Sequence, residues 1–370
     1  MSQITALTMP KWGLTMTEGK IVRWLKREGE GFGAGEEVIE IETTKITNVV
    51  EMPEAGRLGR IVASEGATLP VGALLAVVAP ESVGDSEIEA FVAQFAPVEA
   101  AAETVESAGP QARLVEAGGR RLNCLDLGEG GVPVLLLHGF GADLNGWMFL
   151  QPALAEGRRT IALDLPGHGG SQKELDGAGE ASFAAAIDRL LAALEIERAH
   201  LVGHSMGGGI ALALAARHPE RVASLTLIAS AGLGPEINAD FIAGFVRAQR
   251  RREMQEVLSL LVHDPSQMSR QMVEDVLRYK RLDGVQAALE EIAAEWFPNG
   301  VQRAGNAEAA ASLPMPVQLI WGREDRIIPA AHAEALAARL RVHILPQTGH
   351  LPHMEKAGEV ARLIKGFIAG

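Results

Sequence analysis

The first eighty residues of the chain repeat themselves, and this repeat constrains the fold more than any other feature. The segment GKIVRWLKREGEGFGAGEEVIEI, which begins at Gly19, aligns with GRLGRIVASEGATLPVGALLAVV, which begins at Gly56. Each copy predicts a strand, a Glu-Gly turn, a glycine-containing bend and a second strand. Neither copy can bury its apolar face alone, so the two copies should face one another. The sequence therefore predicts an all-β flattened sandwich with pseudo-twofold symmetry over residues 1–80.

Lys45 lies at the junction of the two copies, within VIEIETTKITNVVEM. Apolar residues alternate on either side of it, in residues 38–42 and 46–50, which predicts two strands that meet at a tip formed by Thr43, Thr44 and Lys45. A lysine at a hairpin tip is usually a solubilising surface charge. Its position between two repeats favours a modification site instead.

This region resembles the biotinyl/lipoyl domain family, in which the modified lysine projects from this hairpin. Biotin carriers usually present Met on both sides of that lysine, whereas Lys45 lies between Thr44 and Ile46 and follows Glu40 and Glu42. This pattern is closer to the lipoyl branch, although that branch commonly has Asp at the position of Thr44. The resemblance implies lipoate attached covalently to Lys45 by a lipoylating enzyme, on a long arm that carries an acyl group between active sites.

Residues 81–110 are predicted to form an acidic tether between two domains. The chain has a net charge of −13, and this segment contains no Lys or Arg but seven Asp or Glu. Apolar residues at helical spacing predict one short helix over residues 86–96, which ends before Pro97. The helix either packs on one of the chain's own domains or recruits a partner enzyme. The Ala-, Glu-, Ser- and Pro-rich remainder is typical of a flexible linker.

From residue 111 onward, near-continuous apolar runs alternate with helical segments. Such runs are typical of strands that are covered on both faces in a parallel sheet. One of them, AHLVGHSMGG, leads through Gly203-His204-Ser205-Met206-Gly207 into a helical segment. Gly-x-Ser-x-Gly between a strand and a helix is the pattern of a nucleophile elbow. Ser205 is therefore the predicted nucleophile.

A serine nucleophile needs a base to take its proton and an acid to orient that base. Asp325 follows the strand-like PVQLIWG, and His350 lies in a Gly-His loop after the last predicted strand. The order Ser, Asp, His is that of α/β-hydrolases. Glu324 and His353 are the alternative acid and base, and His204 is expected to pack beside the site.

Two backbone N–H groups are expected to stabilise the oxyanion. One belongs to Met206, which follows the nucleophile, and the other to Phe140 in the His-Gly-Phe-Gly loop after the first strong strand. Together these motifs resemble the α/β-hydrolase superfamily over residues 111–370. Amphipathic helices over about 233–306 interrupt the pattern and predict a helical cap over the site.

The predicted cap contains a basic cluster in an otherwise acidic protein. The cluster is either a solvated helix face or a site for the phosphates of coenzyme A. Its members are Arg247, Arg250, Arg251 and Arg252.

A lipoyl domain, an acidic tether and an α/β-hydrolase-type domain on one chain resemble the dihydrolipoamide acetyltransferase components of acetoin dehydrogenase systems. The resemblance implies an acyltransferase that passes acetyl from the lipoyl arm to coenzyme A. It also implies two partners, a thiamine-diphosphate-dependent acetoin dehydrogenase component and a dihydrolipoamide dehydrogenase. The chain lacks the C-terminal His-x-x-x-Asp-Gly pattern and the peripheral-subunit-binding domain of the acyltransferases of pyruvate and oxoglutarate complexes.

Two alternatives remain at this stage. The chain is a serine hydrolase (a thioesterase, an esterase or a C–C bond hydrolase) that carries a lipoyl domain, or it is a lipoyl carrier whose second domain serves only in assembly. A product assay with and without coenzyme A separates transfer from hydrolysis.

Composition argues against several other classes of function. The net charge argues against nucleic acid as a partner. No apolar run approaches the ~20 residues that a membrane-spanning helix needs, and the N-terminus shows no signal-peptide pattern, so a cytoplasmic location is expected. The single cysteine, Cys124, is expected to be a buried small hydrophobe rather than a catalytic thiol. No metal site is predicted.

Overall fold

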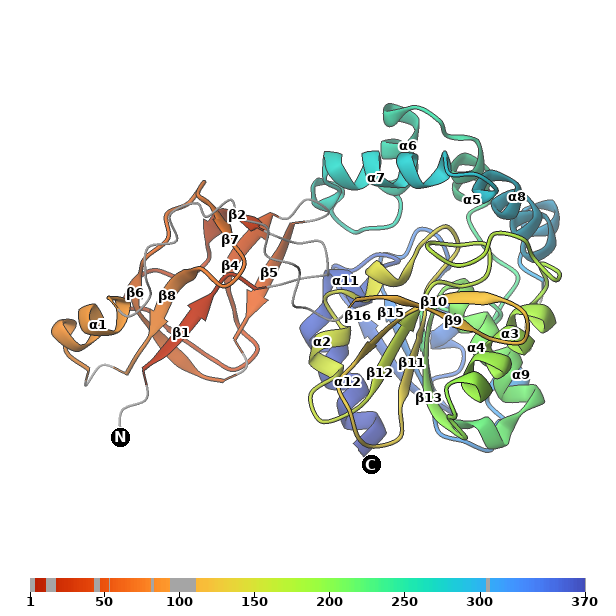
Figure 1. Ribbon diagram of the computed structural model, residues 1–370, viewed down its shortest axis with the longest axis horizontal. Coiled ribbons are helices and arrows are strands. Elements are labelled where there is room, and N and C mark those ends of the chain that lie inside the picture. Colours follow the sequence, from red (N-terminus) through yellow and green to blue (C-terminus); the bar gives the residue numbers. More distant parts are fainter. Residues whose placement is uncertain are drawn as a thin grey trace. The chain divides into compact units, whose positions relative to one another are not determined.

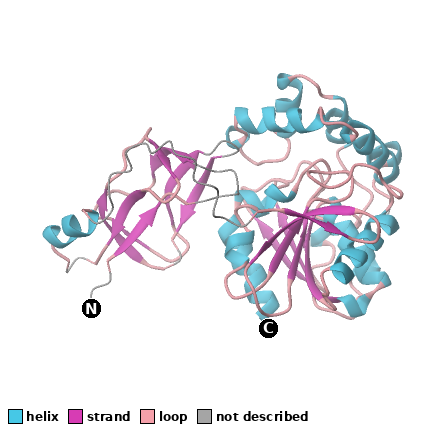
Figure 2. Cartoon of the chain, viewed as in Figure 1, coloured by secondary structure: helices cyan, strands magenta, loops and turns pink. Residues whose placement is uncertain are grey.

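The computed structural model describes residues 4–10, 18–42, 47–52, 54–80, 83–93, 111–303 and 307–369. The chain separates into two compact units. The N-terminal unit is built mostly of strands, and the C-terminal unit combines a central sheet with helices (Figure 2). Among the described residues, none of the helices has the length and apolar character required to cross a membrane.

The N-terminal unit contains two four-stranded antiparallel sheets (Figure 1). In order of pairing, the first sheet consists of β1 (Thr5–Thr8), β8 (Leu74–Val78), β6 (Gly56–Ile61) and β3 (Gly31–Phe32). The second consists of β5 (Thr47–Glu51), β4 (Glu37–Glu42), β2 (Glu18–Trp24) and β7 (Thr68–Pro70). The sequence repeat relates the two sheets, because β2 and β6 begin the two copies. In order of pairing, β5, β4, β2 and β7 of the second sheet correspond to β1, β8, β6 and β3 of the first. The predicted sandwich is confirmed.

The repeated glycines have a backbone reason to recur. Gly29 and Gly66 have φ of +86° and +82°, and Gly35 and Gly72 have φ of +76° and +84°. A side chain at such an angle is strained, so each copy of the repeat needs glycine at both of its turns. The core between the sheets is formed by fully buried apolar side chains, among them Ile21, Ile39, Ile41, Leu58 and Leu75.

Helix α1 (Asp85–Val92) packs on the N-terminal unit. Its Ile88 is 2% exposed and belongs to a cluster with Val77 and Ala79, and its Asp85 forms an ion pair with Arg60 (3.7 Å). Of the two alternatives for the predicted 86–96 helix, the described residues therefore favour packing on the chain's own domain. Residues 94–96 of that range lie outside the described residues.

The C-terminal unit is organised around an eight-stranded sheet with helices on both faces (Figure 2). The strands from β16 to β12 in the pairing order run parallel, and β10 and β9 extend the sheet antiparallel. In order of pairing they are β16 (Arg341–Leu345), β15 (Val317–Gly322), β14 (Val222–Ile228), β13 (Ala199–His204), β11 (Val134–Leu137), β12 (Thr160–Leu163), β10 (Arg121–Leu127) and β9 (Arg113–Glu116). Every residue of β11, β12, β13 and β15 is buried, which explains their continuous apolar sequences.

The helices of this unit fall into two groups. Those around the sheet are α2 (Gln151–Leu154), α3 (Glu180–Ala193), α4 (Met206–Arg217), α9 (Ala307–Ala310), α10 (Ala331–Glu334), α11 (Pro352–Glu355) and α12 (Ala357–Ala369). Those inserted after β14 and before α9 are α5 (Ala239–Arg247), α6 (Arg251–Leu258), α7 (Arg270–Lys280) and α8 (Val285–Trp296). The inserted helices lie together at one end of the strands (Figure 1).

Candidate active site

The turn between β13 and α4 holds Ser205 in a strained conformation. Ser205 has φ of 52° and ψ of −118°, and it is 7% exposed. Its glycine neighbours are required by space, because a Cβ on Gly203 would lie 2.5 Å from the carbonyl oxygen of Gly207, and one on Gly207 would lie 2.2 Å from that of Leu137. Positive φ at a serine that is surrounded by obligatory glycines is the geometry of a nucleophile elbow.

Asp325 and His350 come together on the loops that follow β15 and β16. Asp325 Oδ2 accepts a hydrogen bond from His350 Nδ1 (2.8 Å), and both side chains are almost completely buried. Asp325 Oδ1 accepts from the backbone N–H groups of Ile327 (2.8 Å) and Ile328 (3.0 Å). Because the carboxylate can only accept, Nδ1 carries the proton, and Nε2 of a neutral ring is left as the basic nitrogen.

The alternative acid and base have other partners. Glu324 accepts from the backbone N–H of Thr348 (3.0 Å). The ring of His353 packs against Trp147, with 4.7 Å between ring centroids, and burial lowers its pKa to about 3. A histidine that stays unprotonated to such low pH is a poor general base near neutral pH.

Two buried histidines to which the sequence assigned no role hold the loop around Phe140. His138 Nε2 accepts from the N–H of Leu165 (2.9 Å), and His168 Nε2 accepts from the N–H of Gly141 (3.2 Å). Burial lowers the pKa of both rings, that of His168 to about 3, so both remain neutral acceptors. In the sequence, only the His-Gly and Pro-Gly-His-Gly patterns that contain them indicate that these histidines have a structural role.

This arrangement leaves the backbone N–H of Phe140 available. The N–H of Gly141 is occupied by His168, whereas no acceptor is found for the N–H of Phe140 within the described part of the chain. Met206 is the first residue of α4, where an N–H has no partner inside its own helix. Phe140 and Met206 therefore each present a backbone donor that could stabilise an oxyanion.

His204 joins the nucleophile turn to the loop of His350. Its Nε2 donates to the carbonyl oxygen of His350 (2.8 Å), and burial holds its pKa well below 6.5. The ring packs beside the site, as its place in the motif predicted, with 4.9 Å between its centroid and that of His350. The ring contact and the hydrogen bond thus both join the nucleophile turn to the loop of His350, which is distant in the sequence.

A short segment after α6, residues 259–263, is bonded to the loops that carry the acid and the base. Leu261 O accepts from the N–H of His350 (2.7 Å). Glu355 accepts from the N–H groups of Gly349 (2.9 Å) and His263 (2.7 Å), and burial raises the pKa of this carboxyl. Arg326, next to Asp325, donates to the carbonyl oxygens of Ser259 and Val262. The inserted helices are thus fixed to both loops.

Lys45 lies outside the described residues, whereas the two strands that flank it are described. Strands β4 and β5 pair antiparallel up to Glu42 and Thr47, and Lys45 lies in the connection between these two residues. Ile39 and Ile41 anchor β4 in the core with no exposed surface. A lysine in the connection between two directly paired strands fits an amide-linked carrier group.

Cys124 does not provide a reactive thiol. Cys124 is 2% exposed, and burial raises the pKa of its thiol to about 12, so it is unreactive at neutral pH. In the ranges that the structure covers, no cluster of His, Cys, Asp and Glu could hold a metal ion.

Two family models match the chain. Residues 132–357 match the α/β hydrolase fold, and residues 5–78 match the biotin/lipoyl family described as biotin-requiring enzyme. Among solved structures, a meta-cleavage product hydrolase from Pseudomonas fluorescens IP01, a mutant complexed with acetates, is 29% identical with a TM-score of 0.64, covering 70% of this chain and 97% of that one. The chain thus combines a biotin/lipoyl-type domain with an α/β-hydrolase domain.

Relatives that match the full length of the chain identify its family within this class. The chain is 46% identical over 370 residues (100% of this chain, 99% of the relative) to the dihydrolipoyllysine-residue acetyltransferase component of the acetoin cleaving system of Pseudomonas putida. It is 43% identical over 368 residues (99% and 98%) to the corresponding component of Cupriavidus necator. It belongs to the family of dihydrolipoyllysine-residue acetyltransferase components of acetoin cleaving systems.

Proposed function

We propose that this chain transfers an acetyl group from a lipoyl arm on Lys45 to coenzyme A by way of Ser205. The observation that carries the proposal is the hydrogen bond of 2.8 Å between His350 and Asp325, on loops that His204 joins to the nucleophile turn. Membership of the acetyltransferase family supports acetyl as the group that is transferred.

Lipoate in amide linkage to Lys45 supplies a dithiol that can carry acetyl as a thioester. The chain contributes the hairpin on which the arm stands. We assign residues 1–80 to the carrier domain, residues 81–110 to an acidic tether, and residues 111–370 to the transfer domain, with a cap over about 233–306. A tether rich in Ala, Glu, Ser and Pro lets the carrier approach the site as an intramolecular substrate at high effective concentration.

In the first half-reaction, Ser205 accepts the acetyl group. His350 Nε2 takes the hydroxyl proton while Ser205 Oγ attacks the thioester carbonyl, and Asp325 stabilises the imidazolium. The N–H groups of Met206 and Phe140 stabilise the oxyanion. The C–S bond then breaks, His350 returns the proton to the departing sulfur, and acetyl remains as an ester on Ser205.

In the second half-reaction, the thiol of coenzyme A takes the place of the first sulfur. His350 Nε2 removes its proton, the sulfur attacks the ester carbonyl, and the C–O bond to Ser205 breaks. The proton passes from His350 to Ser205 Oγ, and the serine is regenerated. For transfer to prevail over hydrolysis, the thiol of coenzyme A must reach the acetyl ester before water does.

The remaining partners follow from membership of a multicomponent system. We propose a thiamine-diphosphate-dependent acetoin dehydrogenase component that loads the arm, a dihydrolipoamide dehydrogenase that reoxidises the dithiol, and a lipoylating enzyme that modifies Lys45.

A serine hydrolase is the second candidate, because the C-terminal unit is similar to a meta-cleavage product hydrolase over 97% of that chain. In this case water replaces coenzyme A in the second half-reaction and acetate is released. The ratio of acetyl-coenzyme A to acetate that the wild-type chain produces decides between the two functions.

The test of the mechanism is Ser205→Ala. Acetyl transfer from an acetylated dihydrolipoyl donor to coenzyme A should fall by roughly 10⁴-fold or more. Intact-mass measurement should show the same lipoyl adduct on the variant as on the wild type, and Lys45→Ala should remove that adduct. Transfer by Ser205→Ala at the wild-type rate would exclude an acyl-enzyme on this serine.

A further inference from the structure

A groove between α5 and α8 lies next to the Phe140 loop. It has a volume of about 530 Å³, within the usual range for small-molecule sites. Its walls are mainly apolar, with Ile242, Ala243 and Val246 from α5, and Ala293, Ala294 and Phe297 from α8 and its end. Polar groups are placed at intervals along it, namely Arg247, Glu290 and Asn299.

Phe297 connects this groove with the candidate active site. It lines the groove and also contacts the ring of Phe140 edge-on, with 5.9 Å between centroids. Phe140 carries the free backbone N–H described above. A ligand that fills the groove therefore ends one aromatic ring away from the loop proposed to hold the oxyanion.

One part of the groove wall is basic. Arg247 lines it at the end of α5, and Arg250 and Arg251 follow at the start of α6, all three exposed. In the described ranges none of these three guanidinium groups pairs with a carboxylate, whereas Arg252 pairs with Glu256 (3.1 Å). Three such arginines in a chain of net charge −13 suit a polyanion.

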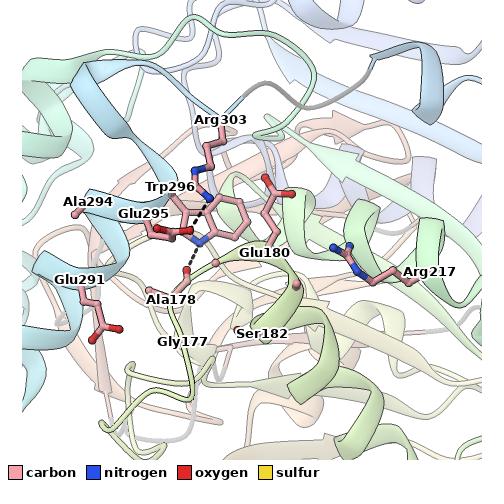
Figure 3. Close-up of a pocket in the computed structure, with 12 residues that line it drawn as sticks. Gly177, Ala178, Glu180, Ser182, Arg217, Glu291, Ala294, Glu295, Trp296 and Arg303 are labelled. Carbon is pink, nitrogen blue, oxygen red and sulfur yellow. Dashed lines mark hydrogen bonds and ion pairs between the residues drawn. The ribbon is translucent and has the colours of Figure 1, made fainter.

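A larger cavity along α8 has the opposite character. It measures about 780 Å³, and Figure 3 shows the residues that line it. One of them, Ala294, also lines the groove. Three carboxylates line it, those of Glu180, Glu291 and Glu295, and one of its two arginines, Arg303, is already paired with Glu295 (2.5 Å). Burial raises the pKa of Glu180. This charge balance opposes a polyphosphate, so the comparison favours the α5–α8 groove.

We infer that the α5–α8 groove binds coenzyme A, with the pantetheine arm along its apolar walls and the phosphates on Arg247, Arg250 and Arg251. The inference rests on the proposed function and specifies where its acceptor binds. The gem-dimethyl and methylene groups of pantetheine fit walls of Ile242 and Val246. The thiol end meets Phe297, and this ring must move aside for the thiol to pass Phe140 and reach Ser205.

The experiment compares coenzyme A with pantetheine, which has the same thiol arm but no nucleotide phosphates. With the full lipoylated chain, Arg247→Ala/Arg250→Ala/Arg251→Ala should raise the KM for coenzyme A by roughly tenfold or more, because charge-assisted hydrogen bonds are lost. The KM for pantetheine should not change. Ala243→Trp fills the groove, and it should raise the KM for both thiols, with Ala243→Val giving a smaller increase in the same direction.

Matched controls lie elsewhere on the same unit. Arg198→Ala removes an exposed arginine, and Ala216→Trp adds a ring at an exposed position of α4. Neither should change the KM for either thiol. If the triple arginine variant raises both KM values equally, or neither, or if Ala243→Trp leaves both unchanged, the groove is not the coenzyme A site.

Direct binding separates this inference from the proposed function. Calorimetric titration of coenzyme A into the Ser205→Ala chain should show binding that the triple arginine variant weakens by a similar factor. If the wild type binds coenzyme A in this groove but forms only acetate, the site stands and the transferase function fails. If the wild type forms acetyl-coenzyme A while the groove and arginine variants behave as wild type, the function stands and the site fails.

Discussion

The two units of this chain arrange their functional residues in different ways. In the N-terminal unit, Lys45 lies in the connection of one hairpin, between Glu42 and Thr47, which pair directly. In the C-terminal unit, the candidate site combines loops that are far apart in the sequence, and the bond between His204 and His350 spans 146 residues. A carrier needs only one lysine on a rigid hairpin, whereas transfer needs several groups fixed relative to each other. Substitutions that are distant from the nucleophile should therefore impair catalysis only when they lie in the C-terminal unit.

After loss of the nucleophile itself, the largest effect is expected from Asp325→Asn. The amide cannot replace the carboxylate that holds Nδ1–H of His350, so the ring adopts the wrong tautomer and acetyl transfer should fall by roughly 10³–10⁴-fold. Steady-state rates with the lipoylated chain measure this loss. Glu324→Gln is the control, since Glu324 bonds to Thr348 instead, and its effect should stay below about tenfold. Equal losses in both variants would mean that the acid has been assigned to the wrong residue.

A smaller effect on the rate is expected from His168→Phe. The variant leaves the N–H of Gly141 without its acceptor and loosens the loop that presents Phe140. We expect kcat to fall by roughly ten- to a hundredfold, part of the loss seen when an oxyanion donor is removed, with little change in KM. His200→Asn removes another buried histidine, one bonded to Ser224, and should lower stability without this loss of kcat. A loss confined to KM in His168→Phe would contradict a role in positioning the loop.

Acid should destabilise the two units unequally. All ten histidines of the chain lie beyond residue 110, and burial lowers the pKa of His168 and His353 to about 3. As the pH falls below about 6.5, the unfolded state binds protons that the folded state cannot, so stability decreases until about pH 3 is reached. Each such histidine contributes a slope of up to about 1.4 kcal/mol per pH unit.

Thermal unfolding of the full chain at pH 7.5 and 5.5, followed by proteolysis and mass spectrometry, distinguishes the two units. The midpoint for peptides of the C-terminal unit should fall at the lower pH more than the midpoint for the N-terminal unit. His353→Phe should reduce this difference. Equal shifts in both units would show that buried histidines do not dominate the acid response.

The smallest effects concern glycines in the two units. Gly66 has φ of +82°, and a Cβ added there would meet no neighbouring atom, so Gly66→Ala adds only backbone strain and should cost about 1 kcal/mol. Gly366 in α12 also has open space, but its backbone is helical, so Gly366→Ala should stabilise by about 0.5–1 kcal/mol. Differential scanning calorimetry measures both changes. Gly66→Asn, which tolerates this backbone region, should cost less than Gly66→Ala, and the reverse order would contradict strain as the cause.

Much of the fold was predictable because its causes are local. The repeat around Gly29 and Gly66 predicted the sandwich, since a turn with positive φ needs glycine wherever it recurs. The continuous apolar runs predicted a parallel sheet covered on both faces. Gly-His-Ser-Met-Gly between a strand and a helix predicted the strained turn at Ser205, because only glycines fit beside it.

The supporting residues could not be predicted in the same way. A buried histidine in Pro-Gly-His-Gly has the same sequence whether it accepts from Gly141, as His168 does, or only fills space. Nothing near Glu355 indicates that it accepts from the N–H groups of Gly349 and His263. These roles depend on which loops meet in three dimensions.

The sequence by itself therefore determined the two classes of domain, the hairpin of Lys45 and the turn of Ser205, because turn geometry and strand patterning depend on neighbouring residues. Only the tertiary structure decided which acid bonds to which base, which donors remain free near Ser205, and which helices line a groove beside Phe140. Parallel strands bring their ends together across more than a hundred residues of chain, and hydrogen bonds form between the groups that meet there.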